Sequence, residues 1–130
     1  MHTLRVTCAL IELHGKVLLT QRSQQMSQPL LWEFPGGKIE PNESEVDCLI
    51  REIKEELGLT IVPLQRLTAV THDYGSKRIE LIPYICRLQE GEIILAEHKA
   101  YSWATQSELL KYNWCPADVP IVQEYIRLKV

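Results

Sequence analysis

Apolar and β-branched residues open the chain in two runs, at residues 4–13 and 17–21. His14 and Gly15 separate these runs, and two strand-like segments around a two-residue break predict a β-hairpin. Later in the chain, a turn at residues 72–77 separates two further strand-like runs. The strand candidates of this second part cover residues 60–71, 78–88, 92–95 and 101–104. The hydrophobic pattern thus predicts six strands.

Helical periodicity is clearest between Ser44 and Gly58. Ser44 to Asp47 has the form of an N-terminal capping box, and Gly58 stands where a left-handed C-terminal cap belongs. Apolar residues recur at helical spacing between these caps, which predicts a stripe that packs on a sheet. The stripe consists of Val46, Leu49, Ile50, Ile53 and Leu57. Two further helix candidates and a polar loop cover residues 105–110, 118–128 and 23–30, respectively.

The same helix carries acidic residues in addition to its apolar stripe. At 3.6 residues per turn, Glu52, Glu55 and Glu56 fall within an arc of roughly 100° on the side away from that stripe. Like charges at these spacings repel, at about 0.2–0.5 kcal/mol per pair in an isolated helix. A solvated surface is one interpretation. The other is a set of oxygen ligands for Mg²⁺, and Gly36 and Gly37, where backbone can approach a ligand closely, favour it.

Charge is distributed unevenly along the chain. The formal net charge is −3, yet residues 36–59 hold seven acidic and three basic residues, so the rest of the chain carries a net charge of +1. Proteins that bind nucleic acid duplexes usually show a basic patch that neutralises phosphates. We therefore expect no duplex as a partner, whereas small phosphorylated ligands remain compatible with this balance.

Length and composition predict one domain spanning residues 1–130, since 45% of the residues are hydrophobic and 24% are charged. The four cysteines form no C-x-x-C pair, which indicates buried thiols in place of a zinc site or a disulfide framework. The N-terminus lacks a basic region followed by a long apolar stretch, and no run reaches the about 20 apolar residues that span a bilayer. We expect a cytoplasmic protein without membrane contact.

One spacing in the chain is highly specific. Gly37 is followed after five residues by Glu43, and seven residues later the run REIKEELGL occupies positions 51–59. This pattern fills every fixed position of the Nudix hydrolase signature, and the chain resembles that family. Residues 32–38 are similar to the entrance of the motif in MutT-type enzymes, and residues 116–120 resemble their C-terminal base-binding segment. Within that group the chain looks most similar to the bacterial CTP pyrophosphohydrolases, which have Asp where MutT has Asn.

The resemblance implies an α/β (α+β) fold in which a mixed β-sheet lies between α-helices. It also implies hydrolysis of a nucleoside triphosphate to the monophosphate and diphosphate by attack of water at the β-phosphorus. Mg²⁺ is the implied cofactor, with Mn²⁺ as a substitute, because a divalent cation neutralises the triphosphate and lowers the pKa of a bound water. The implied metal ligands are the Gly36 carbonyl, Glu52, Glu55 and Glu56, with Arg51 and Glu43 as their support.

Glu97 lies six residues before Trp103 in a predicted loop. This placement matches a metal-binding or general-base glutamate in MutT-type relatives, and an ordinary surface acid is the alternative. Either Glu97 or Glu52 could deprotonate the attacking water, and the sequence does not decide between them. The candidate catalytic residues are Arg51, Glu52, Glu55, Glu56 and Glu97.

Asp118 is the candidate that bears most on nucleotide choice. A carboxylate only accepts hydrogen bonds, so it suits a base edge that presents donors, such as the cytosine amine or the N7–H of 8-oxoguanine. Capping of the final helix is its alternative role. Phosphate or base contacts are expected of Arg22 and Lys38, while Phe34 packs beside the base or in the core. All candidate substrate contacts are Arg22, Glu33, Phe34, Pro35, Gly36, Lys38 and Asp118.

The expected function is Mg²⁺-dependent hydrolysis of CTP, dCTP or modified pyrimidine nucleotides in nucleotide-pool sanitation. An 8-oxo-dGTP diphosphatase is the alternative within the same enzyme class. A non-catalytic nucleotide sensor is a third reading, marked by lost glutamates in the motif, and here none is lost. The expected partner is a small-molecule nucleoside triphosphate, and the chain is a monomer or a homodimer. His72 and His98 show no metal-ligand spacing, so we interpret them as surface residues.

Overall fold

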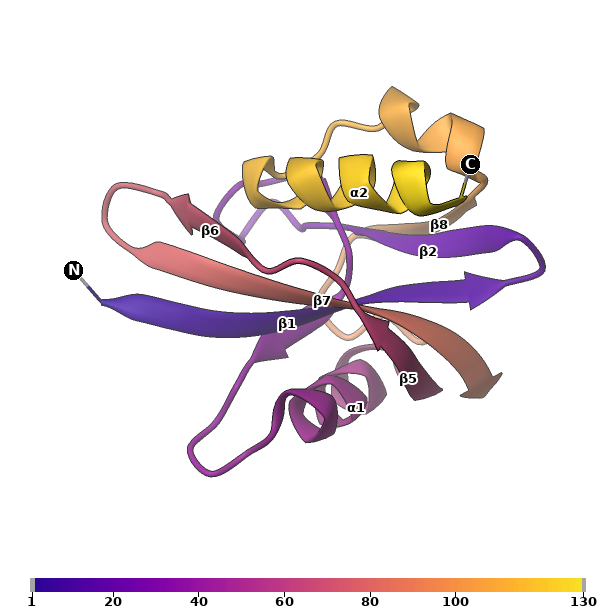
Figure 1. The fold of residues 1–130 in the computed structure, drawn as a ribbon, viewed down its shortest axis with the longest axis horizontal. Helices are drawn as coiled ribbons and strands as arrows, with labels where there is room; N and C mark the ends of the chain where they lie inside the picture. Colours follow the sequence, from indigo (N-terminus) through magenta and orange to yellow (C-terminus); the bar gives the residue numbers. More distant parts are fainter. Residues whose placement is uncertain (1, 130) are drawn as a thin grey trace.

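The computed structural model describes residues 2–129, which form one mixed sheet with helices on both faces (Figure 1). Strands β1 and β7 pair in parallel at the centre, and the other pairings between strands of residues 2–129 are antiparallel. The strands are β1 (Thr3–Leu13), β2 (Lys16–Gln21), β3 (Trp32–Glu33), β4 (Gly36–Lys38), β5 (Thr60–Arg66), β6 (Val70–Asp73), β7 (Arg78–Glu90) and β8 (Ala100–Ala104). The predicted mixed sheet between helices is confirmed.

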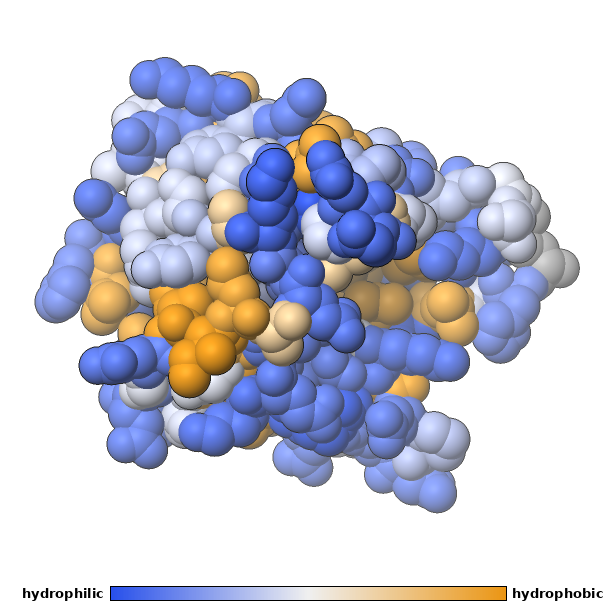
Figure 2. Space-filling view, turned by 180° about the vertical axis from the view of Figure 1, so that it is seen from behind, coloured by the Kyte–Doolittle hydropathy of each residue, from blue (hydrophilic) through white to orange (hydrophobic). Residues whose placement is uncertain are grey.

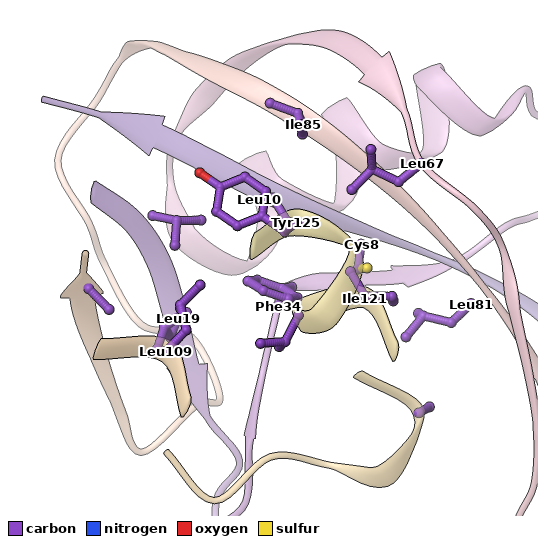
Figure 3. Packing of buried hydrophobic residues seen from close by; sticks show 14 residues of the cluster. Cys8, Leu10, Leu19, Phe34, Leu67, Leu81, Ile85, Leu109, Ile121 and Tyr125 are labelled. Atoms are coloured by element: carbon purple, nitrogen blue, oxygen red, sulfur yellow. The ribbon is translucent and has the colours of Figure 1, made fainter. Parts of the chain in front are cut away.

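Helix α1 (Glu45–Leu57) covers one face of the sheet, and helix α2 (Val119–Lys129) covers the other. Strand β1 supplies both cores. Its Ala9 and Ile11 pack with α1, while Cys8 and Leu10 pack with α2. Because successive side chains of a strand point to opposite faces, a strand buried on both sides is apolar throughout. Figure 3 shows the core on the α2 side.

The predicted helix and both of its caps are confirmed. The Ser44 hydroxyl accepts a hydrogen bond from Asp47 N–H at 3.0 Å, and Gly58 adopts a left-handed conformation with a φ of 71°. The predicted stripe is wrong in part, since Val46 and Ile50 are exposed and Cys48 is fully buried in their place. Cys48 lies about 100° around the helix from Leu49. The face that meets the sheet is therefore rotated toward the glutamates, and this rotation brings two of them into the interior.

Other segments depart from expectation because their backbone groups bond outside a ladder. The run 60–71 splits into β5 and β6, since Leu67 N–H donates to Pro83 O at 2.8 Å and Thr68 N–H donates to the Glu124 carboxylate at 3.0 Å. Residues 92–95 form no strand, because Ile94 N–H donates to Leu57 O at 2.9 Å.

Two predicted helices also have different boundaries. The run 105–110 is a 3₁₀ helix, η1 (Gln106–Lys111), and a 3₁₀ turn, η2 (Pro116–Asp118), precedes α2. Strands β3 and β4 were not predicted. All four cysteines are buried, as expected, and free. No helix within residues 2–129 combines the length and the apolarity needed to cross a membrane.

Candidate active site

The two glycines of β4 lie where no side chain fits. A Cβ atom on Gly36 would stand 1.9 Å from the Thr7 carbonyl oxygen, because β4 pairs with β1 at this point. A Cβ atom on Gly37 would stand 2.2 Å from the side chain of Glu52. The glycines therefore let a strand and a helical carboxylate share one narrow space, and this places the Gly36 backbone beside the acidic residues of α1.

Arg51 organises the carboxylates around it. Its guanidinium donates to both oxygens of Glu43, at 2.6 and 2.9 Å, and to Glu52 at 3.0 Å and Glu55 at 3.2 Å. It also donates to the carbonyl oxygen of Lys38 at 3.3 Å. The bidentate contact between Arg51 and Glu43 lowers the pKa of Glu43 to about 2. One cation thus orients three acids and attaches the helix to β4.

Glu56 has a buried carboxylate oxygen, Oε2, without a hydrogen bond within residues 2–129. Burial raises its pKa to about 8, and the charges of Glu52, Glu33, Glu97 and Glu55 add to this effect in that order. Burial also raises the pKa of Glu52, and the contact with Arg51 opposes this rise. Both carboxylates would be stabilised as anions by a cation placed between them.

This donor set fits a hard divalent cation. Mg²⁺ prefers carboxylate and carbonyl oxygens, and Glu52, Glu56 and the Gly36 backbone supply them. Within residues 2–129, however, no three metal-binding side chains already converge on one point. Arg51 holds Glu52 and Glu55 instead. The acids are therefore gathered, but they are not closed into a coordination cage.

The loop between β7 and β8 brings Glu97 to the same place. Ala96 N–H donates to Glu56 O at 3.1 Å and Ile94 N–H donates to Leu57 O at 2.9 Å, so the loop satisfies two carbonyl groups at the end of α1. Glu97 is exposed and lines a hollow together with Glu56. The loop and α1, far apart in sequence, thus present their acids to one space.

This hollow has a volume of about 430 Å³ and extends from the acids to the face of the sheet covered by α2. Figure 2 shows the molecule from the side opposite to Figure 1, where apolar side chains gather between hydrophilic ones. Phe34 lies at the far end, its ring 4.8 Å from that of Trp114 between centroids. We call the two ends the acid end (Gly36, Gly37, Glu56 and Glu97) and the base end (Phe34, Tyr74, Leu81, Cys115 and Asp118).

Asp118 is only 3% exposed at the base end. Its Oδ2 atom accepts a hydrogen bond from Phe34 N–H at 3.0 Å, and the carboxylate accepts none from an α2 amide within residues 2–129. Burial raises the pKa of Asp118 well above its ordinary value, and the charge of Glu33 raises it further. The helix-capping alternative therefore finds no support in the hydrogen bonds. The role of Asp118 in base recognition stays a prediction.

Glu33 joins two side chains in the wall of the hollow. Its Oε1 atom accepts from Arg22 at 2.9 Å, and its Oε2 atom lies 2.9 Å from His98 Nε2. Arg22 also donates to the Ser27 carbonyl oxygen at 2.6 Å and so closes the loop after β2. The expectation that His98 is a surface residue was wrong, because its side chain is 4% exposed. A single polar residue in a predicted loop carries no signal of burial.

The remaining candidates lie around these groups. Pro35 is buried, and its carbonyl oxygen accepts from Ala9 N–H at 2.7 Å. Lys38 is exposed and does not line the hollow, so its proposed phosphate contact stays a prediction. Tyr74 and Leu81 also line the hollow, although neither was among the predicted site residues, and the Tyr74 hydroxyl accepts from Ala117 N–H at 3.3 Å. For Leu81 the alternation of apolar positions along β7 was an available signal.

The chain is similar in sequence to known proteins. A model of the NUDIX domain matches residues 1–125. The chain is 36% identical over 129 residues to the CTP pyrophosphohydrolase of Escherichia coli K12, which covers 99% of this chain and 96% of that protein. It is 26% identical over 115 residues to the 8-oxo-dGTP diphosphatase of the same organism, covering 88% and 89%.

The chain is also similar in sequence and fold to a solved structure. The MutT protein of methicillin-resistant Staphylococcus aureus 252, described as a Nudix hydrolase in DNA mismatch repair, is 41% identical, with 98% of each chain covered and a TM-score of 0.80. The fold is therefore shared with this relative. The chain belongs to the NUDIX family and is a MutT-like hydrolase, an enzyme that acts on nucleotide phosphoanhydride bonds.

Proposed function

We propose that this enzyme hydrolyses CTP, dCTP or modified pyrimidine nucleoside triphosphates to the monophosphate and diphosphate, with Mg²⁺ as its cofactor. One observation carries the proposal: a single hollow of about 430 Å³ joins a cluster of acids to a buried carboxylate beside an aromatic ring. A volume of this size suits a ligand of nucleotide dimensions. The triphosphate would lie at the acid end and the base at the base end.

The proposed metal site rests on the state of Glu56 and Glu52. When bound, Mg²⁺ neutralises phosphate charge and lowers the pKa of a coordinated water. Glu52, Glu55, Glu56 and the Gly36 carbonyl would hold it. The chain's own contribution is to keep these groups rigid, and Arg51 does so through its contacts with Glu43, Glu52 and Glu55. A pKa near 8 for Glu56 means that its anionic form is disfavoured in the protein alone, and a bound cation would stabilise that form.

Proton removal from the attacking water is assigned to Glu97 or Glu52. Glu97 is exposed in the hollow, which leaves its oxygens accessible to a water molecule. Glu52 is less accessible to a water molecule, because one of its oxygens is 3.0 Å from Arg51 and Gly37 packs against its side chain. These contacts favour Glu97 as the base and Glu52 as a metal ligand.

The base end supports a pyrimidine with an exocyclic amine. Asp118 holds one oxygen on Phe34 N–H, which leaves its other oxygen to accept from a base amine. The relation to the CTP pyrophosphohydrolase of E. coli over 99% of the chain favours the same choice. An 8-oxo-dGTP activity is the second candidate, since the N7–H of 8-oxoguanine is also a donor and a relative carries that name.

The test is diphosphate release with Mg²⁺ from a panel of CTP, dCTP, 5-modified dCTP and 8-oxo-dGTP. We expect the highest kcat/KM on a pyrimidine nucleotide and loss of activity on chelation of the metal. A preference for 8-oxo-dGTP would replace the pyrimidine assignment with the second candidate. Absence of diphosphate release from every nucleotide of the panel would refute the proposed function itself.

A further inference from the structure

Glu33 occupies the middle of the hollow, between the acid end and the base end. Its charge raises the pKa of Glu56 on one side and the pKa of Asp118 on the other. The strand that carries it, β3, is short, but Thr20 fixes it by donating from its hydroxyl to the Glu33 carbonyl oxygen at 3.2 Å. A carboxylate in this place faces whichever part of a nucleotide joins the base to the phosphates.

The two oxygens of Glu33 are each held by a different segment. Arg22, which follows β2, donates to Oε1, and His98, in the loop before β8, contacts Oε2. A carboxylate has about four acceptor positions, so two such contacts fix its plane and leave acceptor capacity for a ligand. The side chain of Glu33 is 19% exposed, and the residue lines the hollow. Its free acceptor positions are therefore accessible to a nucleotide.

His98 is built into the protein at the point where it meets Glu33. Backbone contacts on both sides fix its position: Ala96 N–H donates to Glu56 O at 3.1 Å, and Lys99 N–H donates to Gln21 O at 2.9 Å. Because Glu33 accepts, His98 Nε2 carries the hydrogen, and in the neutral ring Nδ1 then bears a lone pair. The Nδ1 atom is buried and has no partner within residues 2–129. The ring is thus oriented by its Nε2 contact alone.

We propose that His98 is a positioning residue of the nucleotide site, which holds the Glu33 carboxylate so that it accepts hydrogen bonds from the sugar hydroxyls or the base amine of the bound nucleoside. The proposal rests on the proposed function and deepens it, because it assigns the middle of the hollow to the nucleoside. Through the 96–99 segment, the same contact joins this recognition group to the loop that carries Glu97. Because Glu33 would contact the nucleoside and not the reacting phosphates, loss of its contact with His98 should weaken nucleotide binding more than it slows hydrolysis.

The experiment compares His98→Leu, which removes the donor, with His98→Gln, whose amide can reach the same carboxylate oxygen. On the preferred nucleotide of the panel we expect His98→Leu to raise KM about tenfold and to change kcat by less than about threefold, since a hydrogen bond to a charged group is being removed. The Gln variant should restore most of the affinity. Lys99→Ala, an exposed neighbour on the same loop, is the matched control and should leave both parameters unchanged.

A double-mutant cycle separates this role from general support of the loop. In a Glu33→Ala background, His98→Leu should change KM by less than about twofold, because the group that His98 positions is gone. An equal loss in both backgrounds, a loss confined to kcat, or an unchanged KM in His98→Leu would each overturn the proposal. If His98→Leu does not fold, His98→Asn, whose amide is too short to reach Glu33, takes its place.

Comparison of CTP with dCTP identifies the donor. A larger loss of affinity on CTP assigns Glu33 to the 2′-hydroxyl, and an equal loss on both nucleotides assigns it to the 3′-hydroxyl or the base amine, which they share. Failure of the proposed function is visible separately, because the parent enzyme would then release no diphosphate from any nucleotide, whereas failure of the His98 proposal leaves the parent fully active.

Discussion

Each end of the hollow holds a carboxylate with a raised pKa, but the surroundings of the two differ. Around Glu56 stand four other acids, and its buried oxygen has no partner within residues 2–129. For Asp118 burial is the main cause and Glu33 is the one acid that adds to it, while one backbone N–H satisfies one of its oxygens. Repulsion is relieved by a cation, whereas the burial of an acceptor is relieved by a neutral donor. The same functional group is thus prepared for two different parts of one substrate.

The largest expected effect comes from removing the charge at the acid end. Glu56→Gln should lower kcat about 10³-fold, because a metal-bound charge contributes several kcal/mol to transition-state stabilisation. The same variant should unfold at a higher temperature near neutral pH, since the folded parent must keep this buried carboxyl protonated or hold its charge, and the amide requires neither. Steady-state kinetics and thermal unfolding measure the two effects. Hydrolysis as fast as that of the parent would show that the acid end is not the catalytic centre.

A smaller loss is expected when the orientation of the acids is disturbed while all of them are kept. Arg51→Lys retains the positive charge but cannot contact Glu43 bidentately and reach Glu52 together. We expect kcat/KM to fall about 10–100-fold, as for other groups that orient metal ligands. Lys54→Ala on the same helix is exposed and serves as the control. Equal activity of both variants would mean that the ion pairs of Arg51 are only structural.

At the base end, the expected effect is on choice and less on rate. Asp118→Asn exchanges one acceptor for a donor, so the ratio of kcat/KM between the cytosine nucleotides and 8-oxo-dGTP should change about 10-fold, within the range for one base contact. Turnover on the variant's best substrate should change less than this ratio. An identical substrate profile before and after the substitution would remove Asp118 from base recognition.

The last expected effect is a dependence of the unfolding free energy on pH that arises from Glu56 at the acid end. The folded-state pKa of Glu56, about 8, lies above its ordinary value of 4.5, so the folded protein binds more protons than the unfolded chain between these values. Stability should therefore fall as pH rises from about 5 to 8. The difference in unfolding free energy between the parent and Glu56→Gln should change on the order of 2 kcal/mol over this range.

Urea denaturation at pH 5 and pH 8 measures this difference in the absence of divalent cations. Asp118 titrates in the same direction, but it is present in both proteins and cancels in the comparison. Addition of Mg²⁺ should stabilise the parent more at pH 8 than at pH 5, because the anionic form of Glu56 is the one that binds. Parallel pH profiles of the unfolding free energy in the parent and the variant would contradict the raised pKa of Glu56.

Local features of the chain were predictable, because their causes are local. The limits of α1 follow from Ser44 and Gly58, which cap the helix through neighbours a few residues away. The family resemblance rested on the same segment and is confirmed. The rotation of α1 was not predictable from periodicity, because β4 and the loop after β7 decide which side of the helix is covered. That is why Glu52 and Glu56 are partly buried.

The wall of the hollow beyond the acid end was the less predictable part of the site. His98, Tyr74 and Cys115 come from three separate loops, and none of them stands in a pattern with the others. The strand expected at residues 92–95 shows the same limit. Its apolar residues suit a strand, but the N–H groups of Ile94 and Ala96 donate to carbonyl oxygens at the end of α1. Such long-range hydrogen bonds leave no trace in a local propensity.

The parallel pairing of β1 with β7 has a consequence for how the enzyme is made. It aligns Thr3 with Arg78 and Cys8 with Pro83, so both ends of the hollow depend on a closure of some 75 residues. Loops of that length close slowly, and contacts distant in sequence slow folding. Helix α1 has local caps and can form before the cavity that places its acids beside a substrate. Catalytic competence should thus be acquired late, when the central strands meet.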